Sequence, residues 1–205
     1  MSTANRQTER SAATRQALLR VGKRLFAKSG YGGTATEEIV RQARVTRGAL
    51  YHHFRDKQDL FLAVLDEEQK RLAARAAAAA AAEPDPWRAM IAGTNSFLET
   101  CLDPAVQQIV LIDAPAVLGL ERWRETDQSY YLASVKRLLE ASIAQGLIDK
   151  QPVAPLAHVI FGALNEAALV IARAEDKEAA RREVSDVVRR LFEGLQGKPR
   201  NCAPD

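Results

Sequence analysis

The sequence predicts an all-α protein of about nine helices, with a small N-terminal domain and a larger C-terminal helical domain. Apolar residues recur at intervals of three and four along most of the chain, which is the period of an amphipathic helix. Helix-breaking residues fall between these periodic stretches, at Pro84, Pro86, Pro104, Gly146 and Pro152. No stretch shows the apolar-polar alternation that is typical of a half-buried strand. These three observations define the fold class.

The chain begins with a polar segment, residues 1–13, which is expected to be a disordered arm. Such an arm could also contact phosphates or a minor groove. Between Thr14 and Gly30, apolar residues at helical spacing mark a first helix. With two further short helices this segment would complete a three-helix domain over residues 14–60.

The two short helices are joined by a tight turn. Thr36 is a candidate N-cap for the first, over residues 37–43, because its hydroxyl can accept a hydrogen bond from a free backbone N–H. Thr46 is a candidate N-cap for the second, over residues 47–54. Leu50 and the phenylalanine four residues later share one face of this helix and are expected to pack on the first.

The opposite face of the second short helix has the character of a surface that reads DNA. Small and hydrogen-bonding side chains on a slim exposed helix suit a major groove about 12 Å wide. A lysine at the start of the following helix is placed to meet a phosphate. The candidate DNA contacts are Thr36, Thr46, Arg47, Gly48, Ala49, Tyr51, His52, His53 and Lys57.

Charge is distributed unevenly along the chain. Residues 1–60 hold 12 Lys and Arg against 5 Asp and Glu, whereas residues 61–205 hold 17 against 21. The N-terminal part is therefore basic although the net charge is only +3. A concentrated positive field speeds the encounter with a polyanion and makes binding sensitive to salt. A basic helix taken alone is more often just a solvated face, but here it adjoins the helix-turn-helix.

The segment TRGALYHHF, followed by Lys57, resembles the pattern T-x-G-x-L-Y-x-H-F of the TetR family of bacterial transcriptional regulators. The resemblance covers about Thr14 to Leu65. One position departs from it, because Arg44 stands where the turn usually carries glycine. A left-handed backbone at Arg44 would cost roughly 1 kcal/mol, unless the turn takes another shape.

The resemblance implies a homodimeric, ligand-responsive regulator of transcription. Such a protein would bind a palindromic double-stranded operator, act mostly as a repressor, and be released by a small-molecule effector. The effector would prefer a spacing of the two DNA-binding heads that does not fit the operator, and its binding would therefore lower the affinity for DNA. By linkage, bound DNA would lower the affinity for the effector by the same factor. It would work in the bacterial cytoplasm, associated with the nucleoid when bound to DNA.

The rest of the chain predicts a helical ligand-binding and dimerisation domain over residues 61–197 and a tail over 198–205. A long helix starts near Asp56 and continues through seven alanines, Ala76–Ala82, because alanine has the highest helix propensity. Prolines and glycines set the bounds of the remaining helices. These are expected near residues 86–102, 104–118, 121–145, 156–173 and 177–195.

The last two of these helices carry broad apolar stripes. Small residues between Gly162 and Ala168 would let another helix approach closely, which suits a four-helix interface between two copies of the chain. The stripes could instead face only their own domain. The family resemblance favours the dimer, because a palindromic operator requires two reading helices about one DNA turn apart.

The middle helices mix aromatic and polar side chains that could line an effector pocket. Taken singly, each is more often a core or a surface residue. Asp113 is costly to bury unless it is paired, for example with Arg122 or Arg124, so bridging two helices is as good an interpretation as holding ligand. The candidate pocket residues are Trp87, Phe97, Cys101, Asp113, Trp123, Tyr130, Tyr131, His158, Asn165 and Glu166.

Other classes of protein find little support in the sequence. Cys101 and Cys202 are too few and too far apart for a disulfide framework or a metal site, and no cofactor is expected. No apolar run appears long enough to cross a bilayer, and the N-terminal stretch has no hydrophobic segment of the secretory kind. An enzyme would have to use His158 as a base, without a nucleophile or metal-spaced partner. A DNA-binding protein whose partner is not a small molecule is the remaining alternative.

Overall fold

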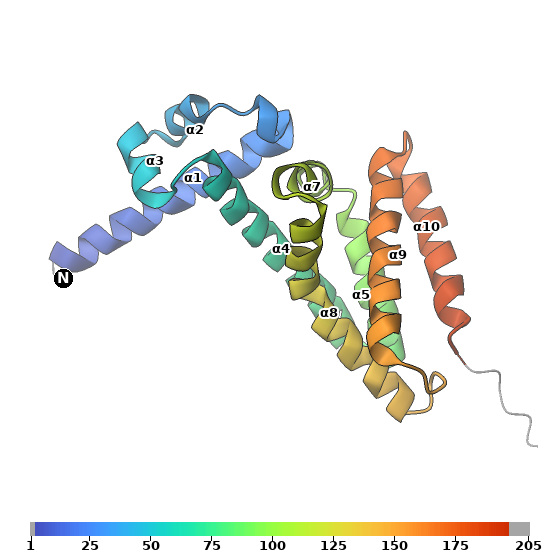
Figure 1. Cartoon of the computed structure of the whole chain (residues 1–205). Helices are drawn as coiled ribbons and strands as arrows, with labels where there is room; N and C mark the ends of the chain where they lie inside the picture. The colour runs from blue at the N-terminus through green and yellow to red at the C-terminus, as the bar shows by residue number, and fades with distance from the viewer. Residues whose placement is uncertain (1–2, 197–205) are drawn as a thin grey trace, which may run out of the picture. The chain divides into compact units, whose positions relative to one another are not determined.

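All regular secondary structure in the computed structural model, which describes residues 3–196, is helical (Figure 1). The helices are α1 (Thr3–Gly33), α2 (Thr36–Ala43), α3 (Arg47–His53), α4 (Lys57–Ala81), α5 (Pro86–Thr100), α6 (Pro104–Val106), the π-helix η1 (Gln107–Asp113), α7 (Ala114–Leu118), α8 (Leu120–Ala144), α9 (Val153–Arg173) and α10 (Lys177–Glu193). Because α6, η1 and α7 are contiguous, these described residues form nine helical segments. The all-α prediction is confirmed; the predicted tail and Cys202 lie outside the described residues.

The chain divides into two compact units. The first holds the residues up to Lys70 together with Asp103–Trp123, and the second holds Arg71–Leu102 and the residues from Arg124 onward. This division differs from the predicted boundary at residue 60. Helix α6 and η1 pack against α1 in the first unit, although sequence position placed them with the C-terminal helices.

An aromatic cluster forms the core of the first unit. The Phe26 and Phe61 rings meet edge to face with 5.2 Å between their centroids, and the Tyr31 ring lies 5.2 Å from Phe61. Ile39 of α2 and Leu50 of α3 are fully buried beside this core. The predicted inward face of the helix-turn-helix is therefore confirmed, because α3 buries Leu50 against the rest of the unit.

Helix α1 differs from its prediction at its N-terminal end. It begins at Thr3, so residues 3–13 are helical where an arm was expected. This segment contains neither glycine nor proline and is rich in good helix formers, which lets the helix extend from the packed part. At the other end the regular helix breaks at Gly30, whose φ is +70°. A Cβ there would also lie 3.2 Å from Gln108 Nε2, so the backbone favours glycine and the space beside it is tight.

The N-caps of α2 and α3 behave differently. Thr46 is extended and its hydroxyl accepts a hydrogen bond from the Ala49 N–H at 3.1 Å, which confirms it as the cap of α3. The prediction for Thr36 is wrong, because the cap position of α2 is Ala35 and Thr36 is the first helical residue. The helix starts one residue early because the preceding residue already adopts the extended conformation that a cap requires.

The turn between α2 and α3 contains Arg44 in the left-handed conformation, with φ 56° and ψ 41°. Of the two alternatives left open by the sequence, the strained backbone is the one adopted. A non-glycine residue in this region costs about 1 kcal/mol or more, whereas glycine adopts it freely.

Replacing Arg44 by glycine is therefore expected to raise the free energy of unfolding by about 0.5 kcal/mol, since the greater chain entropy of glycine offsets part of the relieved strain. Urea denaturation followed by circular dichroism measures the change. Arg20→Gly, at an exposed position inside α1, is the matched control and should lower stability by about 1 kcal/mol. A loss of stability in both variants would contradict the strain at Arg44.

The second unit is built from the C-terminal part of α4 with α5, α8, α9 and α10. Aspartate side chains cap two of these helices: Asp85, before Pro86 of α5, accepts from the Arg88 N–H at 2.8 Å, and Asp176, before α10, accepts from the Ala179 N–H at 2.9 Å. Helix α9 begins three residues before its predicted start. Pro155 lies within its first turn, where a missing N–H costs no helical hydrogen bond.

Helix α9 is long and apolar enough to span a membrane by length and composition. The expectation that no segment has that character is therefore wrong for this helix. Core helices of soluble proteins pass the same test, and here α9 packs against α5 and α10. Its outward positions nevertheless include large apolar residues, such as Val159, whose side chain is 69% exposed.

Candidate nucleic-acid interface and ligand cavity

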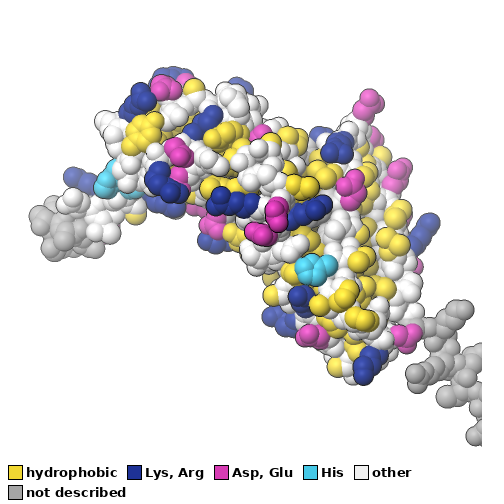
Figure 2. Space-filling model, in the orientation of Figure 1, with side chains coloured by type: hydrophobic (Ala, Val, Ile, Leu, Met, Phe, Trp, Pro, Cys, Tyr) yellow, Lys and Arg dark blue, Asp and Glu magenta, His cyan; other side chains and the backbone are white. Residues whose placement is uncertain are grey.

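Helix α3 buries one face and leaves its polar face accessible. Leu50 and the following Phe54 are buried, whereas the residues of the opposite face are exposed or half-buried. The exposed group is Thr46, Arg47, Gly48, Tyr51 and His52, and the half-buried group is Thr36, Ala49, His53 and Lys57. Figure 2 shows Lys and Arg side chains on the visible faces of α1 to α3, with histidine at the α3 end. All nine predicted contacts are thus at least partly accessible.

Gly48 has no structural role inside the protein. A Cβ added there would meet only Thr46 Oγ1, at 3.9 Å, and the residue keeps an ordinary helical backbone. Glycine in a helix costs about 1 kcal/mol relative to alanine. The fold gains nothing in return, and a close approach to α3 from outside would account for the missing side chain.

Arg47 is oriented by weak contacts. Its guanidinium carbon lies 5.6 Å from the centre of the Tyr51 ring, and Nη1 lies 3.7 Å from Glu37 Oε1. Both members of this ion pair are about two-thirds exposed, so it contributes little to stability. Arg47 can therefore turn toward a base or a phosphate at small cost.

His53 is the more buried of the two histidines on α3. Burial, followed by the nearby His52 and Arg15, lowers its pKa below the ordinary value. At neutral pH the His53 imidazole is therefore neutral and offers one donor and one acceptor nitrogen, which is what contact with a base edge needs.

Lys57 is engaged within the protein. Its ammonium donates hydrogen bonds to the carbonyl oxygens of Tyr31, at 2.9 Å, and Thr34, at 3.1 Å, and lies 4.2 Å from the centre of the Tyr31 ring. The side chain that was predicted to meet a phosphate thus joins the end of α1 and the residue that follows it to the start of α4. At most one of its three N–H donors remains for DNA.

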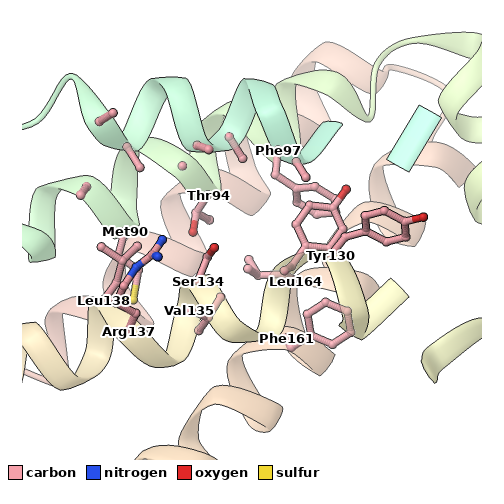
Figure 3. A pocket seen from close by; sticks show the side chains of 18 of the residues that line it. Met90, Thr94, Phe97, Tyr130, Ser134, Val135, Arg137, Leu138, Phe161 and Leu164 are labelled. Carbon is pink, nitrogen blue, oxygen red and sulfur yellow. The ribbon is translucent and has the colours of Figure 1, made fainter. Parts of the chain in front are cut away.

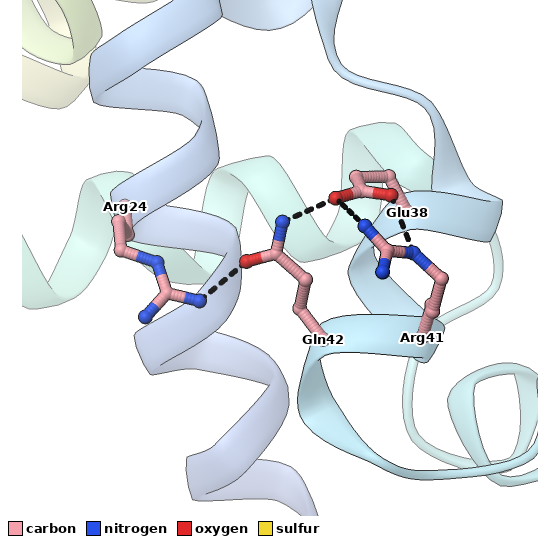
Figure 4. Close-up of polar contacts among 4 residues, drawn as sticks. All are labelled: Arg24, Glu38, Arg41 and Gln42. Atoms are coloured by element: carbon pink, nitrogen blue, oxygen red, sulfur yellow. Dashed lines mark hydrogen bonds and ion pairs between the residues drawn. The ribbon is translucent and has the colours of Figure 1, made fainter.

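A polar network that sequence reasoning missed connects α1 to α2 (Figure 4). Arg24 Nη2 donates to Gln42 Oε1 at 2.5 Å, and the Gln42 amide donates to Glu38. Arg41 Nε and Nη2 donate to the two oxygens of Glu38 at 2.9 and 2.5 Å. These hydrogen bonds lower the pKa of Glu38, Arg41 contributing first and Gln42 second. The spacing of Glu38, Arg41 and Gln42 was a detectable signal; the partner on α1 was not.

Asp113 connects α1 to η1 instead of lining a pocket. Its Oδ2 accepts a hydrogen bond from the backbone N–H of Tyr31 at 2.7 Å, and its Oδ1 accepts from Gln108 Nε2 at 3.0 Å. Neither Arg122 nor Arg124, the partners considered from the sequence, is involved. The bridging interpretation of this carboxylate is thus the one the structure supports.

The second unit contains a partly open cavity of about 280 Å³ between α4, α5, α8 and α9 (Figure 3). Its lining is mostly apolar. The residues are Ala73, Ala76, Ala77, Ala80, Ala81, Ala89, Met90, Gly93, Thr94, Phe97, Tyr130, Tyr131, Ser134, Val135, Arg137, Leu138, Phe161, Leu164 and Asn165. The volume is close to the lower end of the range for small-molecule sites, and the apolar lining with a few polar groups is typical of them.

Four of the ten predicted pocket residues line this cavity, namely Phe97, Tyr130, Tyr131 and Asn165. The structure places the other six elsewhere. Trp87 packs on Phe192 of α10, and Cys101 is fully buried with its thiol donating to the Phe97 carbonyl. Asp113 and Trp123 belong to the first unit, while His158 and Glu166 are exposed on α9.

The aromatic end of the cavity adjoins a buried polar group. Asn165 Nδ2 donates to Asp127 Oδ2 at 2.9 Å, and Asp127 is buried. Burial first and Asp127 second raise the pKa of Tyr131 and raise that of Cys101 to about 12. Both groups therefore stay protonated and uncharged at neutral pH. Within residues 3–196, no group of three or more His, Cys, Asp and Glu side chains is placed to hold a metal ion.

Two family models match this chain. "Tetracyclin repressor-like, C-terminal domain" matches residues 87–195, and "Bacterial regulatory proteins, tetR family" matches residues 18–64. The chain is also similar to a solved TetR-family transcriptional regulator from Pectobacterium atrosepticum, with 34% identity, a TM-score of 0.82, and coverage of 98% of this chain and 100% of the other.

Curated relatives match mainly through the N-terminal region. The regulator QacR of Staphylococcus aureus is 44% identical over 54 residues, which are 26% of this chain and 29% of QacR. AcrR of Shigella flexneri is 43% identical over 68 residues, which are 33% of this chain and 32% of AcrR. The chain thus matches about three-tenths of the length of these relatives. FadR of Bacillus subtilis, solved in complex with stearoyl-CoA, is similar in fold at 17% identity, with a TM-score of 0.70 over 84% of this chain and 96% of FadR.

Proposed function

This chain belongs to the TetR family of DNA-binding transcriptional regulators, and from that premise we propose that it acts as a homodimeric repressor released by a small-molecule effector. Its operator is a palindromic DNA sequence, and its place of action is the bacterial cytoplasm. The observation that carries the proposal is the accessible face of α3, which includes a glycine that the fold itself does not need.

DNA recognition is assigned to the residues on that face. Arg47 and His52 are exposed and have the hydrogen-bonding groups that read base edges in a major groove. Tyr51 and the cap Thr46 are placed for phosphates, which give affinity without sequence choice. Lys57 contributes mainly by holding the helices in register, because two of its donors are already bonded within the protein.

Dimerisation is assigned to α9 and α10. Val159 and Val170 on α9, with Val187 and Leu191 on α10, are large apolar residues that are between 47% and 69% exposed in the single chain. They alternate with small residues of α9, among them the exposed Gly162 and Ala163. Two copies would bury this surface in a four-helix interface, and the two-fold axis would match a palindromic operator.

Effector binding is assigned to the cavity of the second unit. FadR of Bacillus subtilis was solved in complex with stearoyl-CoA, which supports a ligand-binding role for a domain of this fold. An effector that binds better to a DNA-incompatible state weakens operator binding by the coupling factor between the two sites. The enzyme alternative has no comparable support, because His158 is exposed and lies outside the cavity.

Fluorescence anisotropy with the DNA upstream of the protein's own gene tests the proposal. With about six phosphates neutralised, affinity should fall by about a thousandfold between 50 and 200 mM salt. Arg47→Ala should weaken binding or change the preferred sequence, whereas the control Arg88→Ala, at an exposed arginine of α5, should bind as the parent does. Absence of salt-sensitive binding, or a protected site without two-fold symmetry, would overturn the proposed mode of action.

A further inference from the structure

The wall of the cavity on the α4 side is made of alanine. Five alanines, Ala73 to Ala81 at helical spacings of three, one, three and one, place only methyl groups toward the space between the helices. At a rise of 1.5 Å per residue this face is about 12 Å long. Helix α5 comes close to it, since a Cβ on Gly93 would lie 3.3 Å from the Ala76 carbonyl oxygen. Helices α4 and α5 are therefore in close contact at this point of the wall.

Uncharged side chains line almost all of this space. In Figure 3, Thr94 and Ser134 lie in the middle, while Phe97, Tyr130 and Phe161 lie at one end. Asn165 already donates to Asp127. These groups favour an apolar body with at most one or two neutral polar atoms, because a charge placed among them would lose its hydration without a partner.

Among the described residues that line the cavity, Arg137 is the only charged one. Figure 3 shows it beside Met90 and Leu138, at the end of the cavity away from Phe97 and Phe161. Its side chain is exposed and forms no hydrogen bond or ion pair with any residue from 3 to 196. An arginine without a protein carboxylate can bind a carboxylate through two parallel N–H···O bonds, and its guanidinium sheds water more easily than an ammonium does.

We propose that the effector of this protein is an amphiphile with an anionic head, whose carboxylate pairs with Arg137 and whose apolar body lies along the alanine face of α4. A length of about 12 Å corresponds to an extended chain of roughly ten carbon atoms, given C–C bonds near 1.5 Å. This inference rests on the proposed function, because it names the chemical class that the effector cavity selects. It places charge recognition at one end of the cavity and shape recognition along the rest.

Isothermal titration of the full chain with three probes of equal length tests the charge preference. The probes are decanoate, 1-decanol and decyltrimethylammonium, each kept below its micellar concentration. Decanoate should bind at least about tenfold more tightly than decanol, and the ammonium most weakly. Equal affinity for decanoate and decanol, tighter binding of the ammonium, or no binding of decanoate would each overturn the inference.

Variants separate the two parts of the site. Arg137→Gln should lower the affinity for decanoate about tenfold and leave the affinity for decanol unchanged. Arg137→Lys should retain part of the preference for decanoate. The control is Arg124→Gln, at an exposed arginine of the same helix outside the lining, and it should change the affinity for neither probe. Ala77→Leu should lower the affinity for both probes by more than tenfold by filling the cavity. Ala78→Leu, in the same alanine tract but outside the lining, is its control.

Operator binding by the same preparation, measured without any probe, distinguishes a wrong ligand class from a wrong proposed function. If the protein binds its operator with salt sensitivity but decanoate shows no preference that depends on Arg137, the repressor proposal stands and the inferred ligand class is wrong. If operator binding is absent, the proposed function fails whichever probe the cavity accepts.

Discussion

Gly48→Leu is expected to weaken operator binding by about a hundredfold or more while the fold stays at least as stable as the parent. A side chain on the first turn of α3 would occupy the space in which the helix backbone approaches the duplex, and a hundredfold loss corresponds to about 2.7 kcal/mol. In the free protein the added Cβ meets only Thr46 Oγ1, at 3.9 Å. Removing a helical glycine is itself favourable by as much as about 1 kcal/mol.

Anisotropy titrations and urea denaturation, performed on the same preparation, measure these opposite effects. Gly32→Leu is the matched control, because it introduces the same side chain into open space on α1, outside α3. The control should bind DNA as the parent does. If Gly48→Leu bound with full affinity, the leading turn of α3 would not face the duplex, and if it unfolded, Gly48 would have a structural role after all.

The double variant Val159→Glu, Leu191→Glu is expected to be monomeric and to lose between a hundredfold and ten-thousandfold in operator affinity. The two side chains are 69% and 59% exposed in one chain, so charges there cost little until a second copy covers them. Linking two heads makes the second contact intramolecular, and this avidity is worth about 10²- to 10⁴-fold.

Analytical ultracentrifugation gives the mass, and anisotropy gives the affinity. Leu120→Glu provides the control, since it places the same charge at an equally exposed apolar residue, 54% accessible, outside α9 and α10. This control should remain dimeric and bind DNA. A double variant that still sedimented as a dimer would mean that another surface joins the two copies, and the assignment of the apolar face would have to be abandoned.

Local signals accounted for most of what was predicted correctly. Thr46 caps α3 and Asp85 caps α5 because a capping side chain bonds an N–H only three residues away. Leu50 is buried because helical periodicity alone selects its face. The N-cap of α2 was predicted one residue too late, at Thr36, because the hydroxyl of Thr36 suggested a cap whereas the extended residue before the helix is Ala35.

Contacts between distant segments could not be predicted in the same way. Asp113 bonds to a backbone N–H that lies 82 positions earlier, and Lys57 bonds to carbonyls 23 and 26 positions earlier. The sequence indicated that Asp113 needs a partner if it is buried and that the charge of Lys57 could bind a phosphate. It did not indicate which groups meet them, because that depends on how α1, α4 and η1 pack.

By itself, the sequence determined the helical class, the order of the helices and the exposed face of α3, since each depends on residues within about one helical turn. Only the tertiary structure decided which residues share a cavity. The alanine tract, which the sequence predicted only as part of a long helix, lines one wall of the cavity. Arg137 lies at one end of the cavity, although nothing in the sequence distinguishes it from other surface arginines. The reason is that a cavity is the space left when side chains from separate helices fail to meet, which no local pattern records.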